Sequence, residues 1–173
     1  EWQKFCEKIS ELGKYLEDEG MPLAYHHHMG TVIETQKDTE RLIENTHESV
    51  KLTLDTGHML FAKGDSKSIL QNYHERILHV HCKDIRKQVL EKSLKEDLSF
   101  RGAFLEGAFT VPGDGCIDYQ PLFNVLKNNN YSGWLVVEAE QDPAKANPLE
   151  YAKIGYNYLT DTLKKSEIEI YKN

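Results

Sequence analysis

The first twenty residues carry apolar side chains at every third or fourth position, with charged residues between them. This spacing predicts an amphipathic helix that ends near Gly20. The segment that follows, residues 23–28, is short and apolar at its start, which predicts a strand. A helix therefore leads directly into a strand. The apolar positions of the helix are Trp2, Phe5, Ile9, Leu12 and Leu16.

The alternation of helix and strand continues along the chain. Further strands are predicted over residues 51–58, 77–84 and 134–140, because these segments are short, rich in β-branched or apolar residues, and polar at their ends. Further helices are predicted over residues 39–47, 65–73, 87–97, 118–128 and 148–163, with Asp65 and Asp118 as N-caps. Between residues 85 and 115 the rhythm loosens: the charged helical piece 87–97 is followed by residues 100–104 and the turn-rich Pro112-Gly113-Asp114-Gly115, so we expect a long excursion over an active face.

Strands that alternate with helices predict an α/β fold with a parallel sheet of right-handed βα units. One leading helix and four such units would form the C-terminal half of a TIM barrel, since a whole barrel has eight. We therefore expect residues 1–173 to be a single partial barrel domain whose N-terminal half is absent. Its two open sheet edges would need cover from a complementing half or from self-association.

Composition narrows the class of partner. Hydrophobic residues make up 39% and charged residues 28% of the chain, as in a globular protein that folds. The net charge is −7 without a basic cluster, and no apolar run approaches the roughly 20 residues of a membrane helix, so we expect neither nucleic acid nor a membrane as a partner. The three widely spaced residues Cys6, Cys82 and Cys116 indicate no disulfide framework, which favours the cytoplasm.

Every predicted strand ends in ionisable residues of the types that bind metals or transfer protons. The carboxyl ends of parallel strands carry the chemistry of an α/β barrel, so these side chains should meet. Imidazole and carboxylate together suit Mn²⁺, Co²⁺, Fe²⁺ or Zn²⁺. The pairs are His26 and His28, Asp55 and His58, His81 and Lys83, and Glu138 and Glu140.

Each of these residues also has a simpler interpretation when it is taken alone. A lone buried histidine is more often a hydrogen-bonded core residue than a ligand, and Asp55 before Thr56-Gly57 could be a turn residue. Glu138 is harder to explain in this way, because a carboxylate within an apolar strand needs a partner. The coincidence of ligand types at four strand ends favours a metal site.

The histidine run at the end of the first strand divides between two faces. Strand alternation places His26 and His28 on one face and Tyr25 and His27 on the other. We therefore expect His27 to pack away from the pocket.

Five segments occur in the order in which they are found in a known family. They resemble the inosose dehydratases, also called 2-keto-myo-inositol dehydratases, of the xylose isomerase-like barrel superfamily. The match runs from about residue 22 to residue 158 and covers the C-terminal half of a family member. The segments are YHHHMGT at 25–31, LDTGH at 54–58, HVHCKD at 79–84, FTVPGDG at 109–115 and GWLVVEAEQDP at 133–143.

The resemblance implies a divalent metal, most simply Mn or Co, held by one residue from each of the last four strands. Carried over by position, the ligands are His26, Asp55, His81 and Glu138. His26 stands where the superfamily commonly has a glutamate. The resemblance further implies proton-transfer roles for His28 and His58 and a pocket wall formed by Glu34, Lys83, Arg86 and Glu140.

The reaction that the resemblance implies is a dehydration in inositol catabolism. A hydro-lyase of this family converts 2-keto-myo-inositol (scyllo-inosose), a small polyol ketone, to a trihydroxycyclohexane-1,2-dione, and glutathione is associated with the family. Two alternatives stay open: a ketose epimerase or sugar isomerase of the same superfamily, and a catalytically incomplete half-barrel that serves as a fragment or binding module.

Overall fold

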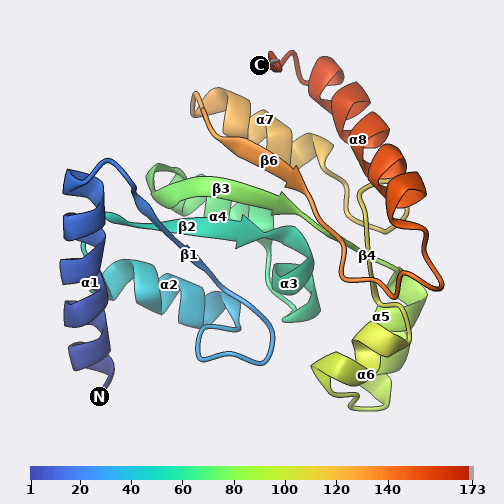
Figure 1. Cartoon of the computed structure of the whole chain (residues 1–173), viewed down its shortest axis with the longest axis horizontal. Helices are drawn as coiled ribbons and strands as arrows, with labels where there is room; N and C mark the ends of the chain where they lie inside the picture. Colours follow the sequence, from blue (N-terminus) through green and yellow to red (C-terminus); the bar gives the residue numbers. More distant parts are fainter. Residues whose placement is uncertain (172–173) are drawn as a thin grey trace.

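A computed structural model describes residues 1–171, and its centre is one parallel sheet (Figure 1). The strand order in space is β1-β2-β3-β6, which is also their order along the chain. All three strand pairs are parallel, as predicted. The strands are β1 (Leu23–His26), β2 (Val50–Asp55), β3 (Ile77–Cys82) and β6 (Trp134–Val137).

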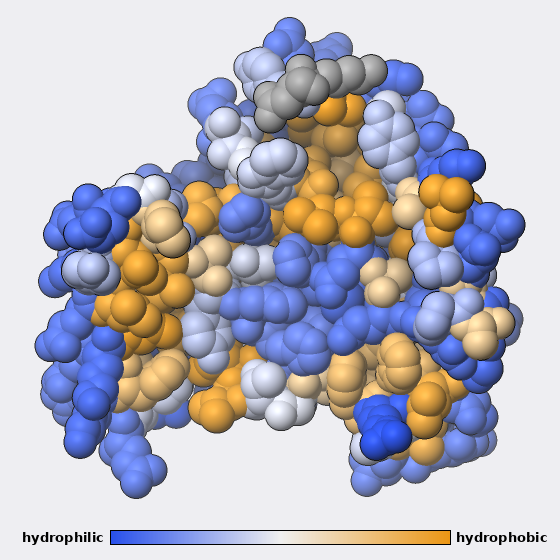
Figure 2. All heavy atoms as spheres, in the orientation of Figure 1, coloured by the Kyte–Doolittle hydropathy of each residue, from blue (hydrophilic) through white to orange (hydrophobic). Residues whose placement is uncertain are grey.

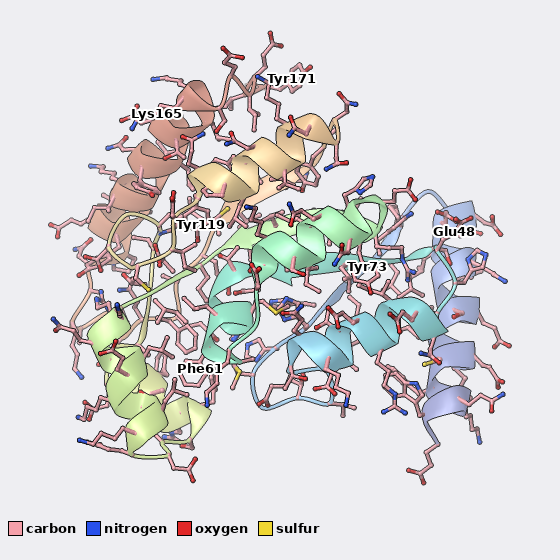
Figure 3. The ribbon with its side chains drawn as sticks, turned by 180° about the vertical axis from the view of Figure 1, so that it is seen from behind. Glu48, Phe61, Tyr73, Tyr119, Lys165 and Tyr171 are labelled. Carbon is pink, nitrogen blue, oxygen red and sulfur yellow. The ribbon has the colours of Figure 1, made fainter. Side chains whose placement is uncertain are left out.

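Helices cover one face of this sheet. Seen from behind in Figure 3, the helices α2, α4 and α7 lie over the strands, while α1 packs beside β1 and β2, and α8 packs on β6 and α7. The main core fills the space between these helices and the sheet, with Leu42, Leu54 and Ile69 fully buried. The helices are α1 (Trp2–Asp18), α2 (Gln36–Asn45), α4 (Ser66–Tyr73), α7 (Gln120–Asn128) and α8 (Pro148–Lys165), with a short 3-10 turn η1 (His74–Arg76) before β3.

The excursion after β3 forms a small unit, which builds a second core together with Phe61 from the segment after β2. Strand β4 (Asp84–Ile85) pairs antiparallel with β5 (Phe109–Thr110), and α5 (Lys87–Lys95) and α6 (Phe100–Leu105) lie between them in sequence. The second core contains Ile85, Ala103 and Phe109 among its buried residues. Helix α6 was not predicted: Ser99 caps it by accepting a hydrogen bond from the Gly102 amide at 3.1 Å.

Several predicted element ends differ from those in the structure. Helix α2 starts three residues before the predicted position, because Thr35 and Asp38 form a capping box. Asp65 caps α4 as predicted. Asp118 was predicted as the N-cap of α7, but this helix begins at Gln120 with Tyr119 in the N-cap position. The Asp118 side chain still accepts a hydrogen bond from the Gln120 amide.

The strands are shorter than predicted, and one predicted strand end is wrong. Residues 56–61 form helix α3 (Thr56–Phe61), so His58 lies on a helix and not on β2. The reason is that Asp55 acts as an N-cap: its Oδ1 accepts a hydrogen bond from the His58 amide at 2.8 Å. Likewise, His28, Lys83, Glu138 and Glu140 all follow the ends of their strands.

The opposite face of the sheet is open over the described residues. An apolar groove near the amino ends of the strands is lined by Leu23, Ala24, Leu78 and Trp134, and Trp134 is 65% exposed. Figure 2 shows hydrophilic residues in the middle of this face with apolar residues on either side. Within residues 1–171, none of the helices combines the length and apolar character that a bilayer crossing requires.

A buried carboxylate organises the turn-rich Pro112-Gly113-Asp114-Gly115 segment. Asp84 is fully buried, and its Oδ1 accepts hydrogen bonds from the amides of Ile85 (2.7 Å) and Ile117 (2.9 Å). Burial raises the pKa of Asp84, although these amides oppose the rise. Gly115 lies so close that a Cβ there would overlap the Asp84 carboxylate.

Replacing Gly115 with Ala should therefore lower the free energy of unfolding by about 1–3 kcal/mol, because the buried carboxylate has no free space to enter. Urea unfolding followed by circular dichroism would measure this. The control is Gly102→Ala in α6, where the nearest atom lies 3.4 Å from the new Cβ and stability should not fall. Equal effects of the two substitutions would contradict the packing argument.

Candidate functional site

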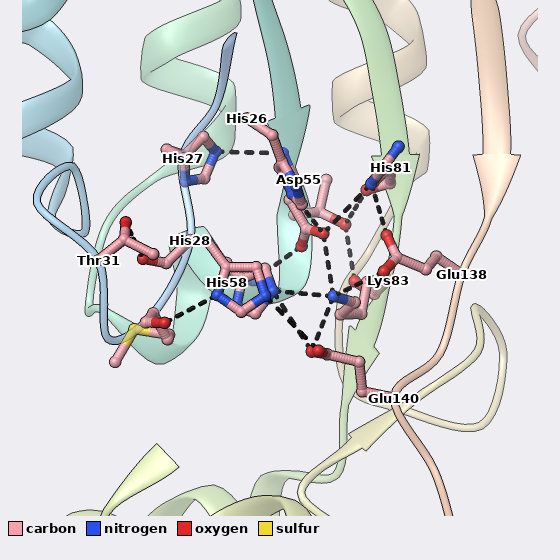
Figure 4. A network of polar contacts seen from close by, with 12 residues as sticks. His26, His27, His28, Thr31, Asp55, His58, His81, Lys83, Glu138 and Glu140 are labelled. Atoms are coloured by element: carbon pink, nitrogen blue, oxygen red, sulfur yellow. Dashed lines mark hydrogen bonds and ion pairs between the residues drawn. The ribbon is translucent and has the colours of Figure 1, made fainter. Parts of the chain in front are cut away.

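The four predicted ligands meet at the carboxyl ends of the four parallel strands. Asp55 stands opposite His81 in the β2–β3 register, and its Oδ2 lies 3.3 Å from His26 Nε2 and 3.7 Å from His81 Nδ1. His81 Nδ1 lies 2.5 Å from Oε2 of Glu138, which follows β6. The sheet thus brings one side chain from each strand to one place (Figure 4).

The contact between His81 and Glu138 is the shortest among the four ligand-type side chains. Their facing atoms are buried and 2.5 Å apart, yet neither meets the geometry of a hydrogen bond with any described residue. These two atoms and a carboxylate oxygen of Asp55 lie within 4.8 Å of one another, a spacing that the ligands of one ion can have. The donor set of two imidazoles and two carboxylates suits a divalent transition metal. The residues present therefore fit a divalent metal.

Lys83 provides a cation of the protein's own beside these ligands. Its side chain is fully buried, and Nζ lies 3.2 Å from Asp55 Oδ2 and 3.1 Å from Glu138 Oε1. The same nitrogen lies 3.0 Å from Glu140 Oε2 and 2.9 Å from His58 Nε2. Figure 4 shows this ammonium in the middle of the polar network.

His28 and His58 form a pair next to the four ligands. Their ring centroids are 3.7 Å apart, and both Nε2 atoms face Glu140, at 3.5 Å from His28 and 3.3 Å from His58. His28 Nδ1 lies 2.7 Å from the Met29 carbonyl, which places the proton on Nδ1 and leaves the Nε2 lone pair free. The structure thus joins both predicted proton-transfer residues to Glu140.

Two of these side chains have strongly lowered pKa values. Burial alone would raise the pKa of Asp55, but contacts with His26, His81 and the Lys83 ammonium outweigh it and hold that pKa well below its usual range. Burial lowers the pKa of His58 to about 2, and the Lys83 ammonium adds to the shift. Asp55 is therefore an anion and His58 a neutral imidazole.

The pKa values of His81 and Lys83 are raised, which indicates a strongly negative potential at the site. The carboxylates of Asp55 and Glu138 raise the pKa of His81 to about 9, against the effect of burial. Burial would lower the pKa of Lys83, but Asp55, Glu138 and Glu140 together raise it. A cation is therefore stabilised at this end of the sheet.

His27, predicted to pack away from the pocket, contacts the backbone of the site. It is fully buried, and its Nε2 accepts a hydrogen bond from the Asp55 amide at 3.1 Å. Because β1 ends at His26, this imidazole takes the place of the next carbonyl of the β-ladder. His27 thus positions Asp55 while its two neighbours face the cluster.

Phe100 lies beside the site although it was not predicted to do so. It begins α6, and its ring lies 5.3 Å from that of His28 and 5.7 Å from that of His58, measured between centroids. Phe100 therefore forms an aromatic wall beside the proton-transfer pair. Its place in an aperiodic segment gave no signal of this contact.

Two predicted pocket residues make other contacts. The Arg86 guanidinium donates hydrogen bonds to the Gly107 carbonyl at 2.7 Å and to Asp114 at 2.7 Å, and so ties the excursion together. Glu34 accepts a hydrogen bond from the Gly30 amide at 2.7 Å and closes the loop after β1. The substrate-binding roles of both residues remain predictions.

Comparisons with known proteins agree with the sequence resemblance. The chain is 50% identical over 162 residues to an inosose dehydratase of Clostridium beijerinckii, covering 93% of this chain and 54% of that protein. It is 46% identical over 164 residues to an inosose dehydratase of Lactiplantibacillus plantarum, covering 94% and 55%. The predicted resemblance is thus confirmed. The chain spans about half the length of these curated relatives.

Solved structures confirm the fold class. The IOLI protein, solved with a bound zinc atom, superposes with a TM-score of 0.67 at 21% identity, covering 91% of this chain and 54% of that one. Residues 1–162 match the family model described as Xylose isomerase-like TIM barrel. With parallel βα units whose ligand-type side chains gather at the strand ends, the chain belongs to the xylose isomerase-like TIM-barrel family.

Proposed function

We propose that this chain is the C-terminal half of a barrel hydro-lyase that removes water from 2-keto-myo-inositol, or scyllo-inosose, to give a trihydroxycyclohexane-1,2-dione in inositol catabolism. The observation that carries the proposal is the convergence of four ligand-type side chains beside the His28–His58 pair. Relatives that are 46–50% identical are named inosose dehydratases, which supports this substrate class.

The proposed cofactor is a divalent metal, with Mn or Co as the native ion. His26, Asp55, His81 and Glu138 would hold it, one from the end of each strand. When bound, such an ion supplies Lewis-acid polarisation of the substrate ketone. Glutathione stays a prediction that rests on the resemblance alone.

Dehydration next to a ketone requires a base for the carbon-bound proton and an acid for the departing hydroxyl. We assign the base to His28, because Nδ1 donates to the Met29 carbonyl and Nε2 is left to accept a proton, 3.5 Å from the Glu140 carboxylate. His58 is a poor base, since burial and the Lys83 ammonium keep it neutral. His58 and Lys83, which share a 2.9 Å contact, are the assigned pair for protonating the hydroxyl.

A ketose epimerase would use the same proton removal but would return the proton to the carbon. The two reactions differ in their products, since only elimination gives a conjugated dione or its enol, which absorbs in the ultraviolet. Absorbance during turnover of the polyol ketone therefore distinguishes them.

The first prediction concerns the ligands. Asp55→Asn should lower the affinity for Mn²⁺ or Co²⁺ at least about 100-fold, because loss of a ligand should exceed the 10–100-fold effect of an outer-shell partner. Isothermal titration calorimetry on the chain measures it. The control is Asp161→Asn on α8, whose side chain is 70% exposed and which should bind like the wild type. Unchanged binding by Asp55→Asn would contradict the assignment.

The second prediction concerns proton transfer. In a protein that includes the N-terminal half, His28→Ala and His58→Ala should each lower kcat by roughly 100- to 10,000-fold, the usual contribution of acid–base catalysis. Metal content should stay unchanged. His79→Ala serves as the control, because His79 lines the groove at the other end of the strands. Normal turnover in either variant would remove that residue from the mechanism.

The third prediction concerns completeness. The walls of a barrel pocket come from all eight units, so the 173-residue chain alone should bind the metal but turn over substrate far more slowly than a version extended by an N-terminal half. Two measurements would identify the partner that completes the barrel. Activity gained on co-expression with the N-terminal half would indicate that half, and a symmetric dimer in sedimentation would indicate self-association. Full activity of the isolated monomeric chain would contradict the half-barrel interpretation.

A further inference from the structure

The polar centre contains two neighbouring sets of ligand atoms. One set is formed by Asp55, His81 and Glu138, with His26 3.3 Å from Asp55, and in the other His28, His58 and Glu140 bring one donor atom each to within 4.8 Å of one another. His58 lies at the border, since it also groups with His26 and Asp55. None of the three residues of the second set belongs to the four strands of the sheet, since each follows a strand end. Two imidazoles and a carboxylate are a competent donor set for a divalent ion.

The Lys83 nitrogen lies between the two sets. It contacts Asp55 and Glu138 on one side, at 3.2 and 3.1 Å, and His58 and Glu140 on the other, at 2.9 and 3.0 Å. Among the described residues, these contacts bring three carboxylates and an imidazole around one ammonium. A second metal ion could not enter without displacing it.

The balance of charges also favours one metal ion beside Lys83. Asp55, Glu138 and Glu140 contribute three negative charges, and Lys83 contributes one positive charge. One divalent ion at the first position would make the centre neutral. A second divalent ion added to an intact Lys83 would leave two uncompensated positive charges in a buried place, which is strongly unfavourable.

We propose that the Lys83 ammonium occupies the second of two adjacent cation positions and so keeps this metal centre mononuclear. The inference rests on the proposed function for the metal at the first position. It adds that Lys83 acts as a tethered substitute for a second metal ion, which cannot dissociate and which, unlike a metal, can donate a proton.

The surrounding backbone is built for this side chain. A Cβ at Gly57 would lie 2.7 Å from Lys83 Cγ, so only a glycine there lets the aliphatic stem cross the start of α3. The Lys83 carbonyl accepts hydrogen bonds from Thr56 Oγ1 at 2.7 Å and from Tyr119 Oη at 3.0 Å. The stem and the carbonyl are thus both held, and they aim the ammonium at the second position.

The test is the number of ions bound per chain. Lys83→Met keeps the length of the stem and removes the charge, and it should raise binding of Mn²⁺ from about one ion per chain to about two, because the freed donors suit a second ion. Calorimetry and metal analysis after gel filtration give the count. Electron paramagnetic resonance gives an independent readout, since two neighbouring Mn²⁺ ions couple magnetically and a single ion does not.

Matched variants make the count specific. Lys83→Arg keeps the charge and should bind one ion, and Lys83→Met combined with Glu140→Gln should return to one because a donor of the second position is lost. Lys83→Gln is a second neutral variant, to be used if Lys83→Met does not fold by circular dichroism.

The outcomes separate this inference from the proposed function. A wild-type chain that binds no ion overturns both. A wild-type chain that binds two coupled ions, or neutral Lys83 variants that fold and bind only one, overturns the inference alone and leaves the first metal position intact.

Discussion

Burial of negative charge is the constraint on which the rest of this structure depends. Asp55 is fully buried at the centre of the sheet's carboxyl edge, and Glu138 and Glu140 stand beside it. An uncompensated buried carboxylate costs several kcal/mol, so the fold must deliver positive charge to the same place. Lys83 does so, and it requires a glycine at position 57 and a buried hydroxyl network to reach there. The packing around Lys83 and the geometry of the site therefore depend on each other.

The sheet and most of the candidate ligands could be predicted from the sequence, for a physical reason. In a parallel sheet, the carboxyl ends of all strands lie on one edge, so ionisable residues at strand ends must meet whatever the details of the helices. His26, Asp55, His81 and Glu138 are brought together in this way. Their ligand roles and the native metal depend on an ion and stay predictions.

What the sequence could not reveal depends on contacts that cross between elements. The predicted strand through His58 was wrong because the Asp55 side chain caps helix α3 by accepting a hydrogen bond from the His58 amide. Asp55 is compatible with either a strand end or a helix cap, and the cap forms only when the chain turns after Asp55. The contact of His27 with the Asp55 amide was not predicted, because an imidazole that replaces a backbone carbonyl leaves no trace in hydrophobic alternation. Helix α6 and Phe100 lie in a segment without periodicity, where local pattern carries no information on distant partners.

Both hydrophobic cores support residues of the candidate site. The ligand-type residues are held by the sheet and its main core, in which ladder hydrogen bonds set their spacing. Phe100 comes instead from the excursion, whose core also contains Phe61 of α3. Phe109 of this second core lies 5.4 Å from His58, measured between ring centroids, so a change in the excursion would reach the His28–His58 pair as well as the aromatic wall beside it.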